Sequence, residues 1–243
     1  MLQSPTAAAV ADRAPATSAA VAAVGVTRRY GSGEAAVDAL RGITIDVPRG
    51  QFAAIMGPSG SGKSTLMHVL AGLDLPTTGS VHVAGQDITA MGDAQLTKLR
   101  RAHIGFVFQA FNLLPTLTAE ENILLPLQLA GRSVDQAWYD AVVERVGLAD
   151  RTKHRPSELS GGQQQRVAVA RALVSEPTVL FADEPTGNLD SKSSHEVLEL
   201  LRDAAGSFGQ TTVMVTHDSD AAAAADRIIH LEDGVVVSDE VSR

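Results

Sequence analysis

The segment Gly57–Thr65, GPSGSGKST, places the strongest constraint on how this chain can fold. It fits the pattern G-x-x-x-x-G-K-[ST] and lies between two apolar runs, FAAIM at 52–56 and TLMHVLAG at 65–72, which read as a strand and a helix. Glycines allow backbone N–H groups to turn inward around an anion, and the positive end of the helix dipole points to the same place. A glycine-rich turn that happens to carry a lysine is the alternative, and the flanking strand and helix argue against it.

This segment predicts a phosphate-binding loop for a nucleotide. Lys63 adds a mobile positive charge for the β- and γ-phosphates, and Ser64 offers its hydroxyl to Mg²⁺. The residues expected to contact the nucleotide here are Gly57, Pro58, Ser59, Gly60, Ser61, Gly62, Lys63, Ser64 and Thr65.

Two carboxylates follow a second apolar run. TVLFAD at 178–183 reads as a central parallel strand, because it is continuously apolar until it ends in an acid. Asp183 is therefore expected at the carboxyl end of the sheet, where it would hold Mg²⁺ through water. Glu184 comes where the chain turns and is placed to accept a proton from an attacking water. A pair of solvated loop acids is the alternative, which a buried strand in a chain with a phosphate loop disfavours.

Two further polar residues end apolar strands. Gln109 follows IGFVF, and His217 follows TTVMVT. If both strands lie beside the strand at 51–56, both side chains emerge at the γ-phosphate end of the site. Gln109 would reach the metal or the water, and His217 would bond the γ-phosphate or Glu184. A histidine after a strand can equally be a structural residue, and its spacing alone does not decide between the two.

Strands and helices alternate along the chain, which argues for an α/β core. Residues 1–22 are expected to form a disordered Ala-rich tail, and the mostly helical stretch from about 93 to 176 an inserted subdomain. The folded domain is expected over residues 23–243. Its last segment, RIIHLEDGVVVSDE, is expected to form a hairpin that turns at Asp233–Gly234. Other strands are expected near 23–30, 43–47, 51–56, 81–83, 104–109 and 211–216, and helices near 63–71, 93–102, 118–130, 133–147, 161–175 and 191–206.

The composition narrows the range of functions that the protein can have. The net charge of −8 has the wrong sign for binding nucleic acid through the overall field, although a local basic patch remains open. No apolar run approaches the roughly 18–20 residues that span a bilayer, so work at a membrane would need another subunit as anchor. The chain has no cysteine, which leaves no disulfide or thiolate site and fits a reducing cytosol.

The stretch LSGGQQQR at 159–166 reads as a second helix start prepared for an anion. Ser160 reads as the N-cap, and the following apolar residues have helical spacing. An ordinary capped helix explains Ser160 but not Gly161 and Gly162, since paired glycines cost helix stability and suggest close backbone approach. One chain already has a complete phosphate loop. The segment therefore binds a different ligand, or it binds the same γ-phosphate from a second molecule.

Taken together, these motifs resemble the ATP-binding cassette family over about residues 24–240. The resemblance implies a P-loop NTPase core with a mixed, largely parallel sheet and flanking helices, an antiparallel β subdomain and an inserted α-helical subdomain. It implies ATP and Mg²⁺ as ligands and a homodimer closed head to tail, with each ATP between one phosphate loop and the partner's LSGGQ.

The resemblance also assigns roles to single residues. Tyr30 would stack on adenine, or else be an ordinary strand aromatic. Glu184 would be the general base and His217 a switch residue, with Gln109 sensing the nucleotide. The remaining assignments are Ser64, Gln109 and Asp183 at the metal, Ser160, Gly161, Gly162 and Gln163 at the partner's γ-phosphate, and Asp190 at the dimer crossing.

The stretches DEPTGNLDSKS and FNLLPTLTAEENILLPL are similar to the branch that serves lipoprotein release, macrolide export and antimicrobial-peptide export. By this resemblance the chain is an ATPase at the cytoplasmic face of the membrane, bound to an integral permease through LLPTLTAEENILLP, with no nucleic acid expected. That segment could also be plain subdomain core. The alternatives are a soluble cassette ATPase acting on nucleic acid or ribosomes, and a regulator that binds ATP without turnover.

Overall fold

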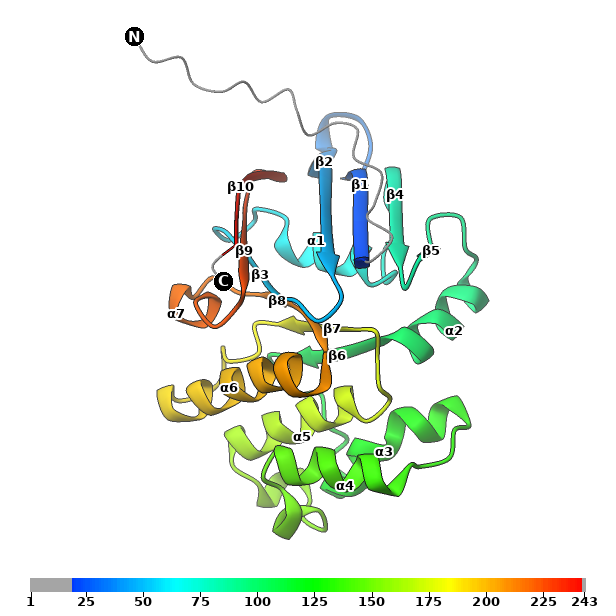
Figure 1. Ribbon diagram of the computed structural model, residues 1–243. Helices are drawn as coiled ribbons and strands as arrows, with labels where there is room; N and C mark the ends of the chain where they lie inside the picture. Colours follow the sequence, from blue (N-terminus) through cyan, green and yellow to red (C-terminus); the bar gives the residue numbers. More distant parts are fainter. Residues whose placement is uncertain (1–18, 242–243) are drawn as a thin grey trace.

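The computed structural model describes residues 19–241, so residues 1–18 of the tail expected over 1–22 lie outside the described residues. Two sheets and a helical layer make up this part of the chain (Figure 1). No helix within 19–241 combines the length and the hydropathy needed to cross a membrane.

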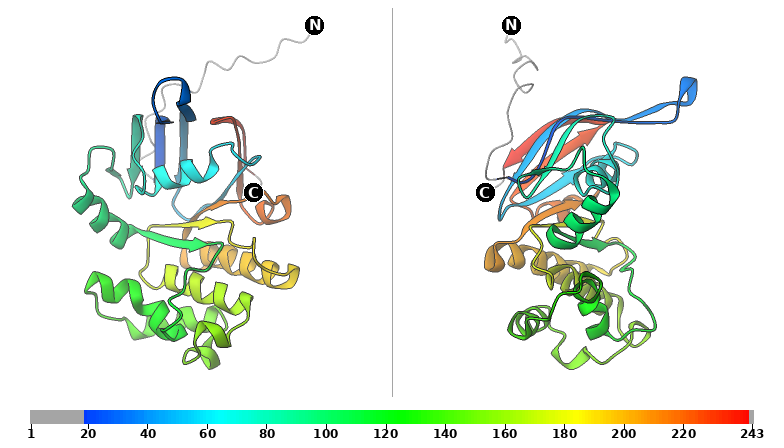
Figure 2. Two further views of the ribbon diagram at one scale, coloured as in Figure 1. Left: turned by 180° about the vertical axis from the view of Figure 1, so that it is seen from behind. Right: turned by 90° about the vertical axis from the view of Figure 1, so that its right-hand side faces the viewer.

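The smaller sheet is antiparallel and has the strand order β2-β1-β4-β5. Its strands are β1 (Ala19–Tyr30), β2 (Val37–Pro48), β4 (Thr78–Val83) and β5 (Gln86–Asp87), with a 3-10 turn at Gly33–Ala35. The right-hand view of Figure 2 shows the β1–β2 connection projecting beyond the rest of the molecule. This sheet confirms the expected antiparallel β subdomain.

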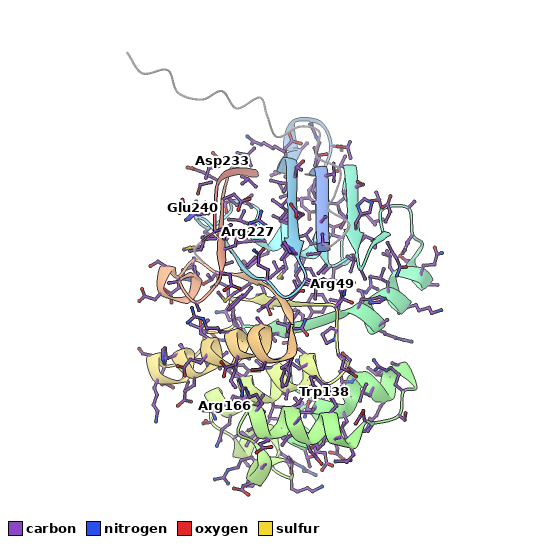
Figure 3. All side chains as sticks on the ribbon, viewed as in Figure 1. Arg49, Trp138, Arg166, Arg227, Asp233 and Glu240 are labelled. Carbon is purple, nitrogen blue, oxygen red and sulfur yellow. The ribbon has the colours of Figure 1, made fainter. Side chains whose placement is uncertain are left out.

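The larger sheet has six strands in the order β10-β9-β3-β8-β7-β6. All neighbouring strands from β9 to β6 are parallel, and only β10 runs antiparallel, so the expected mixed, largely parallel sheet is confirmed. Arg227 on β9, labelled in Figure 3, forms an ion pair with Asp239 on β10 across the closing hairpin. The strands are β3 (Phe52–Met56), β6 (Ile104–Phe108), β7 (Val179–Asp183), β8 (Thr211–Val215), β9 (Arg227–Glu232) and β10 (Val235–Val241).

The helices cover both faces of the larger sheet. Helix α1 packs between the two sheets, while α3, α4 and α5 form the layer at the bottom of Figure 1, next to α6. Trp138 on α4, labelled in Figure 3, meets the ring of Phe208 on α6 edge to face, with 4.8 Å between ring centroids. The helices are α1 (Lys63–Leu70), α2 (Asp93–His103), α3 (Ala119–Ala130), α4 (Gln136–Arg145), α5 (Gly161–Leu173), α6 (Ser191–Phe208) and α7 (Ser219–Ala222), with 3-10 turns at Ala149–Arg151 and Pro156–Glu158.

Strand β7 shows why its sequence is apolar throughout. Val179 and Phe181 pack into the core shared with α1 and the small sheet, whereas Leu180 and Ala182 pack into the core shared with α3, α5 and α6. Alternate residues of a strand point to opposite faces, so a strand covered on both faces needs apolar residues at every position.

Two element boundaries differ from expectation. Strand β1 begins at Ala19 rather than Ala23, because Ala20, Val21 and Ala22 are buried against neighbouring strands. Strand β2 begins at Val37, not at 43. Strand β6, expected near 104–109, pairs with β7 in the large sheet. The division into tail, cassette and helical subdomain remains a prediction.

Candidate functional site

The site lies where four neighbouring strands of the large sheet end together. Ile55, Val215, Asp183 and Phe108 are register partners across β3, β8, β7 and β6. Because parallel strands end at one edge of a sheet, the residues that follow this row emerge side by side. They are the phosphate loop after β3, His217 after β8, Glu184 after β7 and Gln109 after β6.

The phosphate loop is a cradle that side chains at two positions would block. Gly57 has φ +152°, and a Cβ there would lie 2.0 Å from the carbonyl oxygen of Leu231. Gly62 begins α1 with φ +101°, and a Cβ there would lie 2.5 Å from the carbonyl oxygen of Ala39. The wall behind the loop is therefore packed against β2 and β9. The sequence alone could not show this packing. The packing explains why both positions are glycine.

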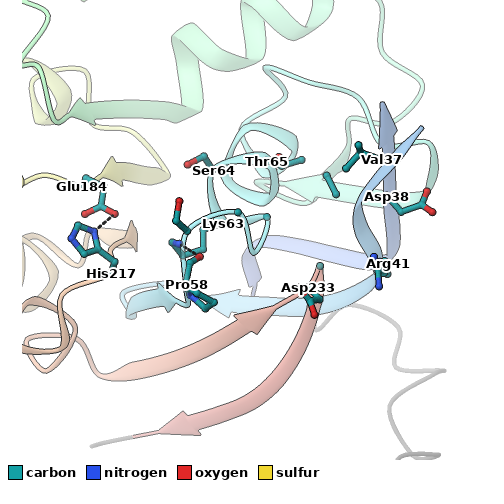
Figure 4. Close-up of a pocket in the computed structure, with 15 residues that line it drawn as sticks. Val37, Asp38, Arg41, Pro58, Lys63, Ser64, Thr65, Glu184, His217 and Asp233 are labelled. Carbon is teal, nitrogen blue, oxygen red and sulfur yellow. Dashed lines mark hydrogen bonds and ion pairs between the residues drawn. The ribbon is translucent and has the colours of Figure 1, made fainter. Parts of the chain in front are cut away.

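Lys63 sits inside the loop with its ammonium group on backbone oxygens. Its Nζ donates to the carbonyl oxygens of Gly57 and Pro58, each at 2.8 Å, and the residue is 8% exposed (Figure 4). Two neutral acceptors are weak partners for a buried cation, which binds an ionised acceptor more strongly. The geometry suits exchange of these carbonyls for phosphate oxygens.

Asp183 ends β7 beside α1, and it is half-buried. Burial raises the pKa of Asp183; of its neighbours, His68 lowers this pKa, Glu184 raises it and Lys63 lowers it. A desolvated carboxylate next to a lysine is a site that a cation would stabilise. The metal-linked role expected for Asp183 from the sequence remains a prediction.

Glu184 adopts a left-handed backbone conformation, with φ +47°. Its N–H donates to Val215 O at 2.9 Å, and its own carbonyl accepts from Gly187 N–H at 3.0 Å. Such a conformation in a non-glycine residue costs about 1–3 kcal/mol and persists where neighbours hold it. The turn sends the Glu184 side chain into the cavity, away from the direction that the strand alternation would give.

Glu184 and His217 form a pair at the cavity wall. His217 Nδ1 lies 2.8 Å from Glu184 Oε1, and the histidine side chain is 71% exposed whereas that of Glu184 is 20% exposed (Figure 4). The hydrogen bond to Glu184, and then its negative charge, raise the pKa of His217. The structure thus shows the contact with Glu184, which was one of the two contacts that the sequence offered for His217.

A single open cavity of about 800 Å³ collects these groups (Figure 4). It is lined by Glu184, His217 and the predicted loop residues Pro58, Ser59, Gly60, Gly62, Lys63, Ser64 and Thr65. Ser61 is buried behind the loop. The volume lies within the range of small-molecule sites, which run to about 1,000 Å³.

Six lining residues were not predicted from the sequence. They are Val37, Asp38, Ala39, Arg41, Asp233 and Gly234, from the start of β2 and the β9–β10 turn. Backbone bonds join these segments to the loop, since Arg41 N–H donates to Gly234 O at 2.8 Å and Gly234 N–H donates to Ser61 O at 3.0 Å. Three of the six, Val37, Ala39 and Gly234, carry no polar side chain, and the charged ones belong to no motif, so only the tertiary contacts reveal them. The Asp233–Gly234 turn was expected as a turn but not as part of the site.

Tyr30 lies next to the cavity and not among its lining residues. Its register partner across the β1–β2 pair is Val37, which lines the cavity. Directly opposed residues of an antiparallel pair share a face, so the Tyr30 ring leaves the sheet on the cavity side. The hydroxyl donates to Asp74 Oδ2 at 2.6 Å, and Arg28 lies over the ring, 4.5 Å from its centroid.

Gln109 emerges at the expected edge of the sheet, but its strand does not have the neighbour that the prediction assumed. Strand β8 lies beside β3, as the prediction for His217 requires, but β6 is separated from β3 by β8 and β7. The condition that both strands flank the phosphate-loop strand therefore fails for Gln109. Its Nε2 donates to Asn188 Oδ1 at 3.3 Å, and Asn188 Nδ2 donates to Gln109 O at 3.0 Å. These bonds fix Gln109 to the loop that also carries Glu184.

The LSGGQ segment, Leu159–Gln163, starts α5 with a capping box. Ser160 Oγ accepts from Gln163 N–H at 3.3 Å, and Gln163 Oε1 accepts from Ser160 N–H at 2.9 Å. None of its residues lines the cavity of its own chain. A Cβ on Gly162 would lie 2.7 Å from Ser193 Oγ, so this glycine has a packing reason within the chain.

Asp190 also has a structural task. It caps α6, accepting from Ser193 N–H at 3.0 Å and Ser193 Oγ at 2.8 Å. These hydrogen bonds, the backbone one first, lower the pKa of Asp190. Since Ser193 also touches Gly162, the start of α6 and the start of α5 form one surface on the exposed side of the chain.

Comparisons with known proteins agree with this geometry. A family model described as ABC transporter matches residues 40–187. The lipoprotein-releasing system ATP-binding protein LolD of Geobacter metallireducens is 51% identical over 216 residues, which are 88% of this chain and 96% of LolD. The macrolide export ATP-binding/permease protein MacB of Bdellovibrio bacteriovorus is 49% identical over 89% of this chain. The chain spans 33% of that MacB, about a third of its length.

A solved structure has the same fold. The ATP-binding cassette MJ0796, described as a dimer in a post-hydrolysis state bound to ADP and Pi, superposes with a TM-score of 0.82 at 42% identity. The match covers 92% of this chain and 99% of MJ0796. A family model that covers more than half of the chain, and a relative about half identical over almost its whole length, show that this chain belongs to the ABC transporter family of ATP-binding proteins.

Proposed function

We propose that the chain is the ATP-hydrolysing subunit of a membrane ABC transporter complex. The observation that carries this proposal is that the phosphate cradle and the Glu184–His217 pair open onto one cavity. A binding module needs only the cradle. A carboxylate turned into the cavity by a strained backbone adds a proton acceptor at the place where the terminal phosphate would lie.

The donor set of the site fits Mg²⁺. The expected ligands are the Ser64 hydroxyl, the Asp183 carboxylate through water and the side-chain oxygen of Gln109, all hard oxygen donors of the kind this ion prefers. The desolvated carboxylate of Asp183 is the group that gains most from a nearby cation. When bound, Mg²⁺ neutralises charge on the β- and γ-phosphate oxygens.

Lys63, Glu184 and His217 then have different roles in the reaction. Lys63 exchanges its two carbonyl partners for phosphate oxygens, and the N–H groups at the start of α1 face the same anion. Glu184 accepts the proton of the water that attacks the γ-phosphorus. His217, already bonded to Glu184, holds that carboxylate in place and can donate to a phosphate oxygen.

Two copies of the chain complete two sites. The start of α5, with Ser160, Gly161, Gly162 and Gln163, is exposed or half-exposed apart from Gly162 and lies outside the cavity of its own chain. A helix N-terminus attracts phosphate, so the partner's ATP is the ligand we assign to it, with Asp190 beside the dimer crossing. The dimer described for MJ0796 is consistent with this arrangement.

A membrane permease is the partner we propose, at the cytoplasmic face. A second cavity of about 270 Å³ lies between the edge strand β6 and α3 and α5, and its floor includes the stacked rings of Phe106 and Phe108. Leu114 nearby is 46% exposed, but Ala119 and Ile123 of the expected docking segment are buried in the core. The docking surface is therefore this apolar cavity with Leu114, and not the whole stretch 113–126.

The test combines turnover with capture of the partner. Wild type is expected to hydrolyse Mg-ATP, and Glu184→Gln to bind ATP with unchanged affinity while losing turnover and forming a stable dimer. Pull-down from detergent-solubilised membranes should recover an integral membrane protein. Recovery of ribosomes or nucleic acid instead, or ATP binding without any turnover in the presence of the membrane partner, would contradict the proposed function.

A further inference from the structure

The Gln109 loop, residues 109–117, contains two consecutive non-glycine residues in the left-handed region. Phe111 has φ +59° and Asn112 has φ +50°. Only Ala110 separates these two residues from Gln109. L-residues populate this region sparsely, so two in succession need surroundings that hold them. The structure shows which side chain does so.

Arg171, on the last turns of α5, binds the carbonyls of both strained residues. Its Nη1 donates to Asn112 O at 2.5 Å and its Nη2 donates to Phe111 O at 2.8 Å. The planar guanidinium presents two parallel donors, so it fixes both carbonyls at once, which a lysine ammonium cannot do with the same geometry. Burial lowers the pKa of Arg171, which shows that the charge is held in a poorly solvated place.

Gln165, one and a half turns earlier on α5, holds the other side of Gln109. It is fully buried, and its Nε2 donates to Phe108 O at 3.3 Å and to Pro185 O. Phe108 precedes Gln109, and Pro185 follows Glu184. The backbone of the Gln109 loop is thus bound to α5 both before and after Gln109.

We infer that Arg171 is a positioning residue for Gln109, coupling it to the helix that begins with LSGGQ. The side chain of Gln109 is confined on its other side by Gly187, where a Cβ would lie 2.6 Å from its Nε2. Any shift of α5 when its first turn meets a partner's nucleotide would therefore carry Gln109 with it. This inference rests on the proposed ATP hydrolysis, and Arg171 itself touches no lining residue of the nucleotide cavity that the structure records.

The test is a double-mutant cycle of Arg171→Met and Gln109→Ala in the full chain, assayed for Mg-ATP turnover. Arg132→Met is the matched control, because Arg132 also donates to a backbone carbonyl at the end of α5, Ser175 O at 2.9 Å, but does not touch the loop. A misplaced active-site group typically costs about 100-fold in rate. We expect Arg171→Met to lower kcat about 10-fold to 100-fold with unchanged ATP affinity, and to add nothing in the Gln109→Ala background.

Hydrogen–deuterium exchange supplies a readout without turnover. Amides of 109–113 should exchange faster in Arg171→Met than in wild type, and at the wild-type rate in Arg132→Met. If Arg171→Met does not fold, Arg171→Lys, which keeps the charge but donates in one direction, should give an intermediate rate. Unchanged exchange in these variants, or rate losses that multiply in the double mutant, would overturn the inference. If the wild type showed no turnover, the proposed function would be contradicted instead. The exchange measurement alone would then test whether Arg171 holds the Gln109 loop.

Discussion

The two glycines of LSGGQ are required for different physical reasons, and alanine substitution can distinguish these reasons. A Cβ on Gly162 would meet Ser193 Oγ at 2.7 Å and Ser193 Cβ at 2.9 Å, closer than real Cβ contacts. A Cβ on Gly161 would meet only Leu189 at 3.6 Å and Phe111 at 3.8 Å, which are ordinary contacts. Within one chain, therefore, only Gly162 has to be glycine. We therefore expect the requirement for glycine at position 161 to come from a contact with another molecule.

The structure sets the expected magnitudes. Gly161→Ala at a compatible helical position should stabilise the isolated chain by about 0.4–1 kcal/mol, by restricting the unfolded chain. Gly162→Ala gains a similar helix preference of about 1 kcal/mol but adds overpacking of about 1–3 kcal/mol against Ser193, for a net loss of about 0–2 kcal/mol. At this chain length 1 kcal/mol shifts Tm by about 2–4 °C. Tm should rise by about 1–4 °C for Gly161→Ala and fall by up to about 8 °C for Gly162→Ala.

The assay has two stages. Thermal unfolding without nucleotide gives the two Tm shifts, and light scattering with Mg-ATP in the Glu184→Gln background gives the dimer. We expect Gly161→Ala to be more stable as a monomer and yet weaker as an ATP-dependent dimer, since its methyl group would stand where the partner's phosphate approaches. If Gly161→Ala dimerises like its parent, or loses stability as Gly162→Ala does, the reasoning about the glycine pair is refuted.

The other predictions concern the phosphate loop and the Glu184–His217 pair. Lys63→Ala should weaken ATP binding at least about 100-fold, because a charge-assisted contact to two phosphates is lost from a buried position; calorimetry with undiminished affinity would exclude the cradle. NMR titration should place the His217 pKa above 6.5, and Glu184→Gln should return it toward 6.5. The pair stabilises the fold fully below the unfolded histidine pKa, and this contribution is lost as pH rises through the raised folded pKa. A His217 pKa at or below 6.5 in wild type would show that the pair does not form in solution.

The sequence predicted those features that local patterns encode. The phosphate loop, the apolar β7 and the polar residues after β6, β7 and β8 are all short-range signals, and they were found at their places. The order of strands in a parallel sheet is not a local property. It depends on how crossovers pack, which is why the sequence could state the adjacency of β6 and β3 only as a condition; in the structure β8 and β7 lie between them.

Other misses have the same origin. The first residues of β1 are alanines, which carry no strand signal until Val21 and its neighbours are seen buried between β2 and β4. Val37 and Ala39 line the cavity, although neither carries a polar side chain that would mark it in the sequence. The turn of Glu184 into the cavity depends on a left-handed φ that Val215 and Gly187 hold through backbone bonds.

The proposed mechanism requires that each ATP is enclosed by two chains, and the absence of cysteine from the sequence allows a direct cross-linking test. Ser59, which lines the cavity, and the exposed Ser157, before α5, would be changed to cysteine in separate chains that both carry Glu184→Gln. With Mg-ATP and a short bis-maleimide, the mixture of the two chains should give a covalent dimer, and neither chain alone nor the mixture without ATP should do so. Cross-linking that is independent of ATP, or that is equal in each chain alone, would contradict a head-to-tail dimer with shared sites.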